Sequence, residues 1–168
     1  MKKLLCLFLL LFIVTLSGCS VKDTLSAECV SDELILPQTP VFYMAADIPH
    51  GTFLTDSCKD GCCALYTHKG YEVMQEVFPA ASADEAFRYL TGRGAEELHP
   101  IKTSNFPQEE YRFSWTAAGE NGPISCNALL FYDGSHGYSI CVFCPFGEEK
   151  LYREDFYRIF SGTKLFPL

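Results

Sequence analysis

Residues 126–143 have the sequence CNALLFYDGSHGYSICVF. The Asp133-Gly134 pair divides it into two runs, 126–132 and 135–143, and residues 138–143 are β-branched and aromatic in character. Asp-Gly at such a junction favours a tight turn, because these residues tolerate the positive φ angles of a two-residue hairpin loop. Residues 127–132 and 138–143 are apolar on both faces, so we expect this hairpin at the centre of a sheet that is covered on both sides.

Further strand signals precede this hairpin. Tyr111, Phe113 and Trp115 alternate with polar residues, which is typical of a strand with one buried and one solvated face. The Asn121-Gly122 pair predicts the turn that joins this strand to the central hairpin. Earlier strands are expected at residues 34–36, 41–46, 62–67 and 71–78.

Two helices are predicted, one before and one after the later strands in the sequence. Ser82 and Glu85 have the spacing of a capping box, and an apolar stripe follows until Gly92 or Gly94 ends the helix. Residues 148–160 carry a second apolar stripe at helical spacing. The order of elements predicts an α+β fold with an antiparallel sheet of about five to seven strands and two helices.

This order of elements resembles the PsbP/Mog1-like α/β/α sandwich. The resemblance is carried by residues 131–134 and 138–140 of the aromatic hairpin and by the final helical segment, 152–164. It covers residues 62–165 and is one of element order, without a diagnostic motif. It implies an extrinsic or binding protein. Members of the family share no catalytic residues, so the resemblance carries no site over to this chain.

The N-terminus predicts export. Two lysines precede an apolar run at residues 4–15, which is too short for a membrane-spanning helix of about 20 residues. The next residues, Leu16-Ser17-Gly18-Cys19, resemble the lipobox of bacterial lipoproteins. The resemblance implies that Cys19 receives a diacylglyceryl group and becomes the new N-terminus. An ordinary signal peptide with a coincidental cysteine, or an uncleaved anchor, are the alternatives.

These features divide the chain into three parts. Residues 1–18 are the expected lipoprotein signal peptide, 19–28 a tether and 29–168 a single globular domain. The acyl chains on Cys19 would hold that domain at the extracytoplasmic side of the cell membrane. The membrane, through diacylglyceryl-Cys19, is therefore the first expected partner, and a protein at the cell envelope is the second.

Seven cysteines remain after export and lipidation, and an oxidising compartment favours disulfides between them. With a two-residue turn Cys126 faces Cys141, and with a wider loop it faces Cys144; Cys126–Cys141 is the preferred pair. Cys29 is expected to bond to one of the clustered cysteines. The full set is Cys29, Cys58, Cys62, Cys63, Cys126, Cys141 and Cys144. No metal site is predicted, because Cys141 and Cys144 on a strand would lie about 10 Å apart on opposite faces.

Composition and motifs limit the function. Of the 168 residues, 48% are hydrophobic, and the net charge of −8 disfavours nucleic acid as a partner. No serine-hydrolase, zinc-protease or phosphate-loop motif occurs, so we expect no enzyme activity and no cofactor. The aromatic residues expected to form a contact surface are Tyr111, Trp115, Tyr132 and Tyr138.

The preferred hypothesis is a membrane-anchored lipoprotein with a non-catalytic binding or envelope-support domain. A thiol or metal-binding envelope protein is the first alternative, and it would use Cys58, Cys62 and Cys63 together with His68. A small solute-binding lipoprotein is the second alternative.

Overall fold

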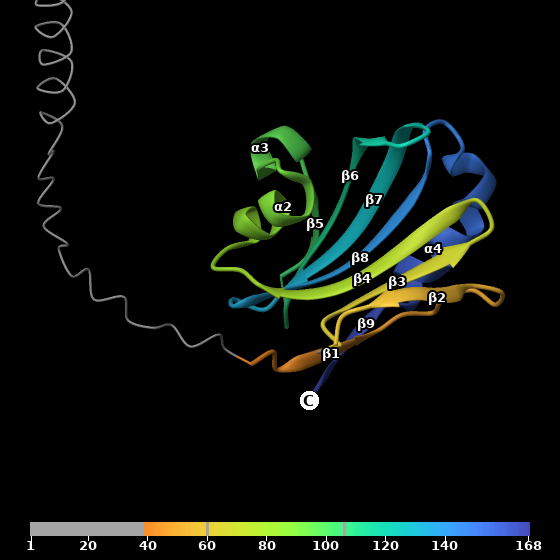
Figure 1. The fold of residues 1–168 in the computed structure, drawn as a ribbon. Coiled ribbons are helices and arrows are strands. Elements are labelled where there is room, and N and C mark those ends of the chain that lie inside the picture. The colour runs from red at the N-terminus through yellow and green to blue at the C-terminus, as the bar shows by residue number, and fades with distance from the viewer. Residues whose placement is uncertain (1–38, 60, 106) are drawn as a thin grey trace, which may run out of the picture. The chain divides into compact units, whose positions relative to one another are not determined.

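A seven-stranded antiparallel sheet dominates the computed structural model, which describes residues 39–59, 61–105 and 107–168 (Figure 1). The strand order is β2-β3-β4-β8-β7-β6-β5, so β8 lies at the centre. The strands are β2 (Phe53–Ser57), β3 (Cys63–His68), β4 (Tyr71–Pro79), β5 (Ile101–Ser104), β6 (Glu109–Gly119), β7 (Gly122–Tyr132) and β8 (His136–Pro145). A second, two-stranded sheet pairs β1 (Phe42–Ala45) with β9 (Lys164–Pro167).

Helices pack on both faces of the large sheet (Figure 1). One face carries α2 (Ala83–Thr91) and α3 (Ala95–Leu98), and the other carries η1 (Glu149–Tyr152) and α4 (Arg153–Gly162). Alternate residues of β8 enter the two cores, as the alternation of side chains along a strand requires. The expected α+β class with an antiparallel sheet is confirmed. None of the helices in the described ranges is long and apolar enough to cross a membrane.

Helix α2 begins and ends where its local signals predict. The Ser82 Oγ accepts a hydrogen bond from the Glu85 N–H at 3.1 Å, and the Glu85 carboxylate accepts one from the Ala81 N–H at 2.7 Å. Gly92 ends the helix with a φ of 74°, and its N–H donates to the Arg88 carbonyl. Phe87, which is only 2% exposed, anchors the helix on the sheet.

The register of the central hairpin differs from both expected pairings. Tyr132 pairs with Gly137, so residues 133–136 form the loop between β7 and its partners on β8, and Cys126 faces Phe143. His136, the last of these four residues, begins β8 through its pairing with Pro79 of β4. The expected Cys126–Cys141 and Cys126–Cys144 disulfides are therefore wrong, and Cys126, Cys141 and Cys144 are free thiols. The physical reason is that the Asp133 carboxylate accepts hydrogen bonds from the Ser135 and His136 N–H groups, which closes a loop of intermediate length.

The disulfide of the described residues joins Cys58 and Cys63, whose Cα atoms lie 5.2 Å apart. It closes the turn between β2 and β3. Because these two sulfurs bind each other, neither is available to Cys29, which lies outside the described residues. The general expectation of a disulfide is confirmed. A bond within this cluster was not predicted, and the expected bond from Cys29 to Cys58 or Cys63 is contradicted.

Candidate functional site

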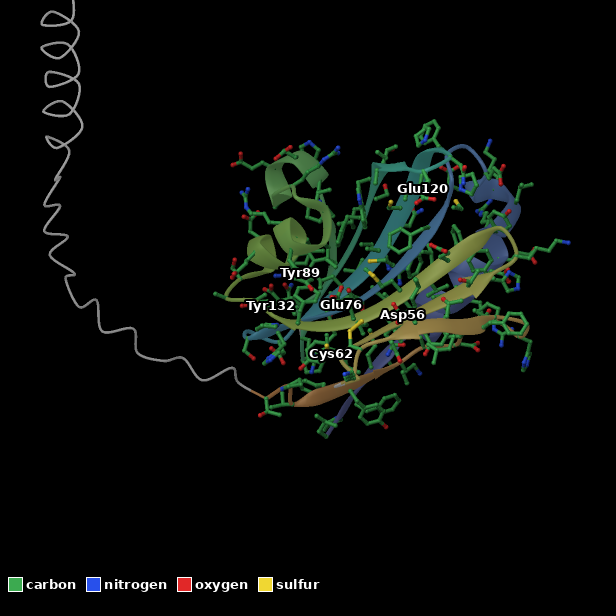
Figure 2. All side chains as sticks on the ribbon, viewed as in Figure 1. Asp56, Cys62, Glu76, Tyr89, Glu120 and Tyr132 are labelled. Carbon is green, nitrogen blue, oxygen red and sulfur yellow. A yellow bond between two sulfur atoms is a disulfide. The ribbon has the colours of Figure 1, made fainter. Side chains whose placement is uncertain are left out.

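A groove of about 400 Å³ lies at the end of the central strand β8. One wall is the β3–β4 hairpin turn, the other is the β6–β7 hairpin turn, and the end of β8 lies between them. Figure 2 labels Glu120 at the β6–β7 turn. We call this site the hairpin groove. The residues that line it are Thr67, His68, Gly70, Tyr71, Glu72, residues 119–124, Phe143, Cys144 and Pro145.

The β6–β7 wall depends on a close approach of backbone. Gly119 pairs with Gly122 across the turn, and a Cβ atom at Gly119 would lie 2.9 Å from the Gly122 carbonyl oxygen and 2.9 Å from Ile124 Cγ2. Gly122 has a φ of 121°, which other residues rarely adopt. The two glycines therefore allow a turn of only two residues, Glu120 and Asn121, and this turn sets the edge of the groove.

Aromatic and aliphatic side chains form the apolar part of the groove. Phe143 and Ile124 are half-buried and lie on the sheet face that α2 covers further along. The Trp115 ring meets the Phe143 ring edge to face at 6.4 Å and stacks on Phe113 at 5.7 Å. The apolar face thus continues from the core under α2 into the groove, where it is open to a ligand.

The polar lining is acidic. Glu72 and Glu120 are exposed, and none of the described residues that line the groove is lysine or arginine. His68 stacks on Tyr71 with ring centroids 4.6 Å apart, and its Nδ1 atom is buried without a hydrogen-bond partner among the described residues. This lining favours a ligand with a cationic or hydrogen-bond-donating group over an anionic one.

The thiols of Cys126, Cys141 and Cys144 are poor nucleophiles. Burial raises the pKa of Cys126 to about 11 and that of Cys141 to about 12. Burial also raises the pKa of Cys144, which lines the groove but is only 2% exposed, and the nearby carboxylates of Glu149 and Glu148 add to this shift. All three therefore stay protonated at neutral pH, whereas thiol chemistry requires the thiolate.

The structure separates His68 from Cys63, although both belong to the predicted thiol or metal site. Cys63 and His68 occupy opposite ends of β3, and five residue steps along a strand separate them by about 17 Å. The disulfide also removes Cys58 and Cys63 as thiolate ligands. Within the described ranges, no group of three or more His, Cys, Asp and Glu side chains could hold a metal ion.

The four aromatic residues predicted to form a contact surface differ in their burial. Tyr138 is fully buried and donates a hydrogen bond to Asp133, so its assignment to a contact surface is wrong. Tyr111, Trp115 and Tyr132 are half-buried on the α2 side of the sheet, and their role in contacts stays a prediction. Cys19, the predicted lipidation site, lies outside the described residues.

The hairpin groove was not predicted from the sequence. Its walls come from two turns that are about 50 residues apart in sequence, and only the sheet order places them on either side of β8. The one available signal was the pair Gly119 and Gly122, which marks a tight turn with close backbone approach.

The sequence matches no known family model, and no curated protein matches it. The fold is similar to that of LpqN, described as involved in cell envelope biogenesis of Mycobacterium tuberculosis. The TM-score is 0.52 at 8% identity, over 77% of this chain and 87% of that one. A protein of Bacteroides thetaiotaomicron gives a TM-score of 0.48 at 6% identity, over 74% of this chain and 47% of that one. At such identities the likeness concerns the fold alone.

Proposed function

We propose that this chain is an exported lipoprotein, held at the outer side of the cell membrane by a diacylglyceryl group on Cys19, whose domain binds a ligand without catalysis. The observation that carries the anchor is the sequence Leu16-Ser17-Gly18-Cys19 directly after two lysines and an apolar run. Two or more acyl chains hold a protein stably on a bilayer, at about 0.8 kcal/mol for each buried methylene.

The fold supports a non-catalytic role at the envelope. Helices on both faces of an antiparallel sheet agree with the α/β/α sandwich of PsbP/Mog1-like proteins, which are extrinsic or binding proteins. LpqN, which has a similar fold, is involved in cell envelope biogenesis. We propose an envelope role for this chain on the combined basis of its N-terminus and its fold.

The hairpin groove is the proposed binding site. Its volume of about 400 Å³ lies within the range of small-molecule sites, about 300–1,000 Å³. We infer a ligand whose apolar part packs on Phe143 and Ile124 and whose cationic group lies near Glu72 and Glu120. A small solute or the side chain of a partner protein would satisfy this chemistry.

Labelling with a fatty acid tests the anchor. Cells that express the full chain are grown with a radiolabelled fatty acid, and the purified protein is counted. We expect label in the unmodified chain and none in Cys19→Ala, because that sulfur is the proposed attachment atom. Cys6→Ala is the matched control and should keep the label, since residue 6 lies in the signal segment. Equal labelling of Cys19→Ala and the unmodified chain would refute the anchor.

Photocrosslinking from the groove tests the binding site. A benzoylphenylalanine residue replaces Asn121 in the groove wall or, as a control, Glu97, an exposed glutamate of α3. Glu72 and Glu120, the proposed partners of the cationic group, stay in place. After irradiation of intact cells, the mass of the purified protein is measured. We expect an adduct from position 121 only, small for a solute and large for a protein. Identical adducts from both positions, or none from position 121, contradict the proposed site.

A further inference from the structure

The two-stranded β1–β9 sheet is apolar on the face that points away from the core. Phe42, Met44 and Leu165 pack inward against the large sheet and α4. Because side chains alternate along a strand, their neighbours point outward. These neighbours are Val41, Tyr43, Phe166 and Leu168, with exposed fractions of 57%, 49%, 40% and 76%. We call these four residues the β1–β9 patch.

The β1–β9 patch is continuous. Tyr43 pairs with Phe166 across the two strands, and their rings stack with centroids 5.3 Å apart. The Leu168 N–H donates to the Val41 carbonyl at 2.9 Å, which places this second pair beside the first. A sheet with one solvated face ordinarily alternates apolar with polar residues. Here the outward face is apolar except for Lys164, so it is suited to a partner other than water.

The charges around the patch suit a lipid surface. The outward face of β1 and β9 carries Lys164 opposite Ala45 and no acidic side chain among the described residues. The carboxylate of Asp47, two residues after the end of β1, accepts hydrogen bonds from the Arg158 guanidinium at 2.6 and 2.9 Å. Tyrosine and phenylalanine on a surface with a flanking lysine are typical of proteins at the headgroup–acyl boundary of a bilayer.

The position of the patch in the chain connects it with the proposed anchor. Residues 20–38, a stretch of 19 residues, separate Cys19 from Thr39, and Val41 follows two residues later. Nineteen residues span at most about 65 Å when fully extended. An anchored Cys19 would therefore keep the patch at an effective concentration on the order of millimolar relative to the bilayer. A weak apolar contact is then sufficient for docking.

We propose that the β1–β9 patch docks on the bilayer that holds Cys19, with Tyr43 and Phe166 at the headgroup–acyl boundary. This inference rests on the proposed lipid anchor and adds an orientation to it. A second copy of the chain on the patch, or a cover formed by residues 20–38, are the competing occupants.

Quenching by lipids tests the docking on the full, lipidated chain. The native tryptophan is removed by Trp115→Phe, and one new tryptophan is introduced by Tyr43→Trp or, as a control, by Phe53→Trp on β2. Phe53 is also an exposed aromatic residue, 72% accessible, but lies on the edge of the other sheet. The protein is placed in phosphatidylcholine vesicles with bromine on the acyl chains. We expect at least a twofold loss of emission for Tyr43→Trp and little change for Phe53→Trp.

The outcomes separate this proposal from the anchor. If the protein floats with the vesicles but Tyr43→Trp is quenched no more than Phe53→Trp, docking is refuted and the anchor stands. If the protein does not float, the anchor fails and docking fails with it. In detergent without vesicles, acrylamide should quench the emission of Tyr43→Trp. If acrylamide does not quench it, the patch is covered by protein and docking on lipid is refuted. Residues 20–38 are then the cover, or a second copy of the chain where sedimentation shows a dimer. Phe166→Trp repeats the test if Tyr43→Trp folds poorly.

Discussion

Phe87→Ala is expected to lower the free energy of unfolding by about 3–5 kcal/mol, the usual cost of emptying a buried aromatic site. Phe87 is 2% exposed and fixes α2 on the sheet. Its ring meets those of Tyr111 and Phe113 edge to face, with centroids 5.2 and 5.1 Å apart. Truncation to alanine removes these contacts and leaves a cavity that strands β6 and β7 cannot fill by a small shift.

Urea denaturation followed by circular dichroism measures this loss. Phe53→Ala is the matched control, because its side chain is 72% exposed and its truncation should change the free energy of unfolding by no more than about 0.5 kcal/mol. If the two variants lose the same stability, α2 does not pack on the sheet as described, and the core on that face must be assigned differently.

Local signals explain which elements the sequence could predict. Helix α2 was predicted because Ser82, Glu85 and Gly92 satisfy backbone groups within the helix itself. Strands β6 and β7 were predicted from alternation and from a glycine turn. Strand β9 was not predicted, because its four residues are held by pairing with β1, more than 100 residues earlier. Strand β2 was also missed, since all its residues are exposed and it shows no apolar pattern.

The candidate site was less predictable than the fold. The groove depends on the position of one turn relative to another, and no local signal reports that position. The cysteine pairing failed for a related reason, since the register of the central hairpin is set by a side chain. A loop of residues 133–136 in place of a two-residue turn moves every cross-strand partner, so that Cys126 faces Phe143.

The side chain that sets the register of the central hairpin is that of Asp133. We expect Asp133→Ala to lower the free energy of unfolding by about 3 kcal/mol. Its Oδ1 accepts hydrogen bonds from the Ser135 and His136 N–H groups, both at 2.8 Å, and from the Ser135 hydroxyl at 3.0 Å. Its Oδ2 accepts one from the Tyr138 hydroxyl at 2.7 Å. Asp47→Ala is the control, because it breaks an exposed ion pair worth at most about 1 kcal/mol.

The same contacts make the stability depend on pH. Burial alone would raise the pKa of Asp133, but the hydrogen bonds from Tyr138, His136 and Ser135 outweigh it and lower the pKa below the ordinary value. A lowered pKa in the folded state means that the carboxylate stabilises the fold above about pH 4, and that this contribution is lost as the pH falls further. Asp133→Asn should therefore show a weaker loss of stability on acidification than the unmodified chain.

A double-mutant cycle with Tyr138→Phe separates the hydrogen bond from the loop. In Asp133→Ala the fully buried Tyr138 hydroxyl loses its acceptor, which costs about 1–3 kcal/mol for an unsatisfied buried donor. In the Tyr138→Phe background there is no hydroxyl to leave unpaired, so Asp133→Ala should cost less by that amount. Equal costs in both backgrounds would mean that Asp133 acts only through the 133–136 loop. The register of the central hairpin would then depend on the contacts of Asp133 with Ser135 and His136, and the hydrogen bond from the Tyr138 hydroxyl would not contribute to it.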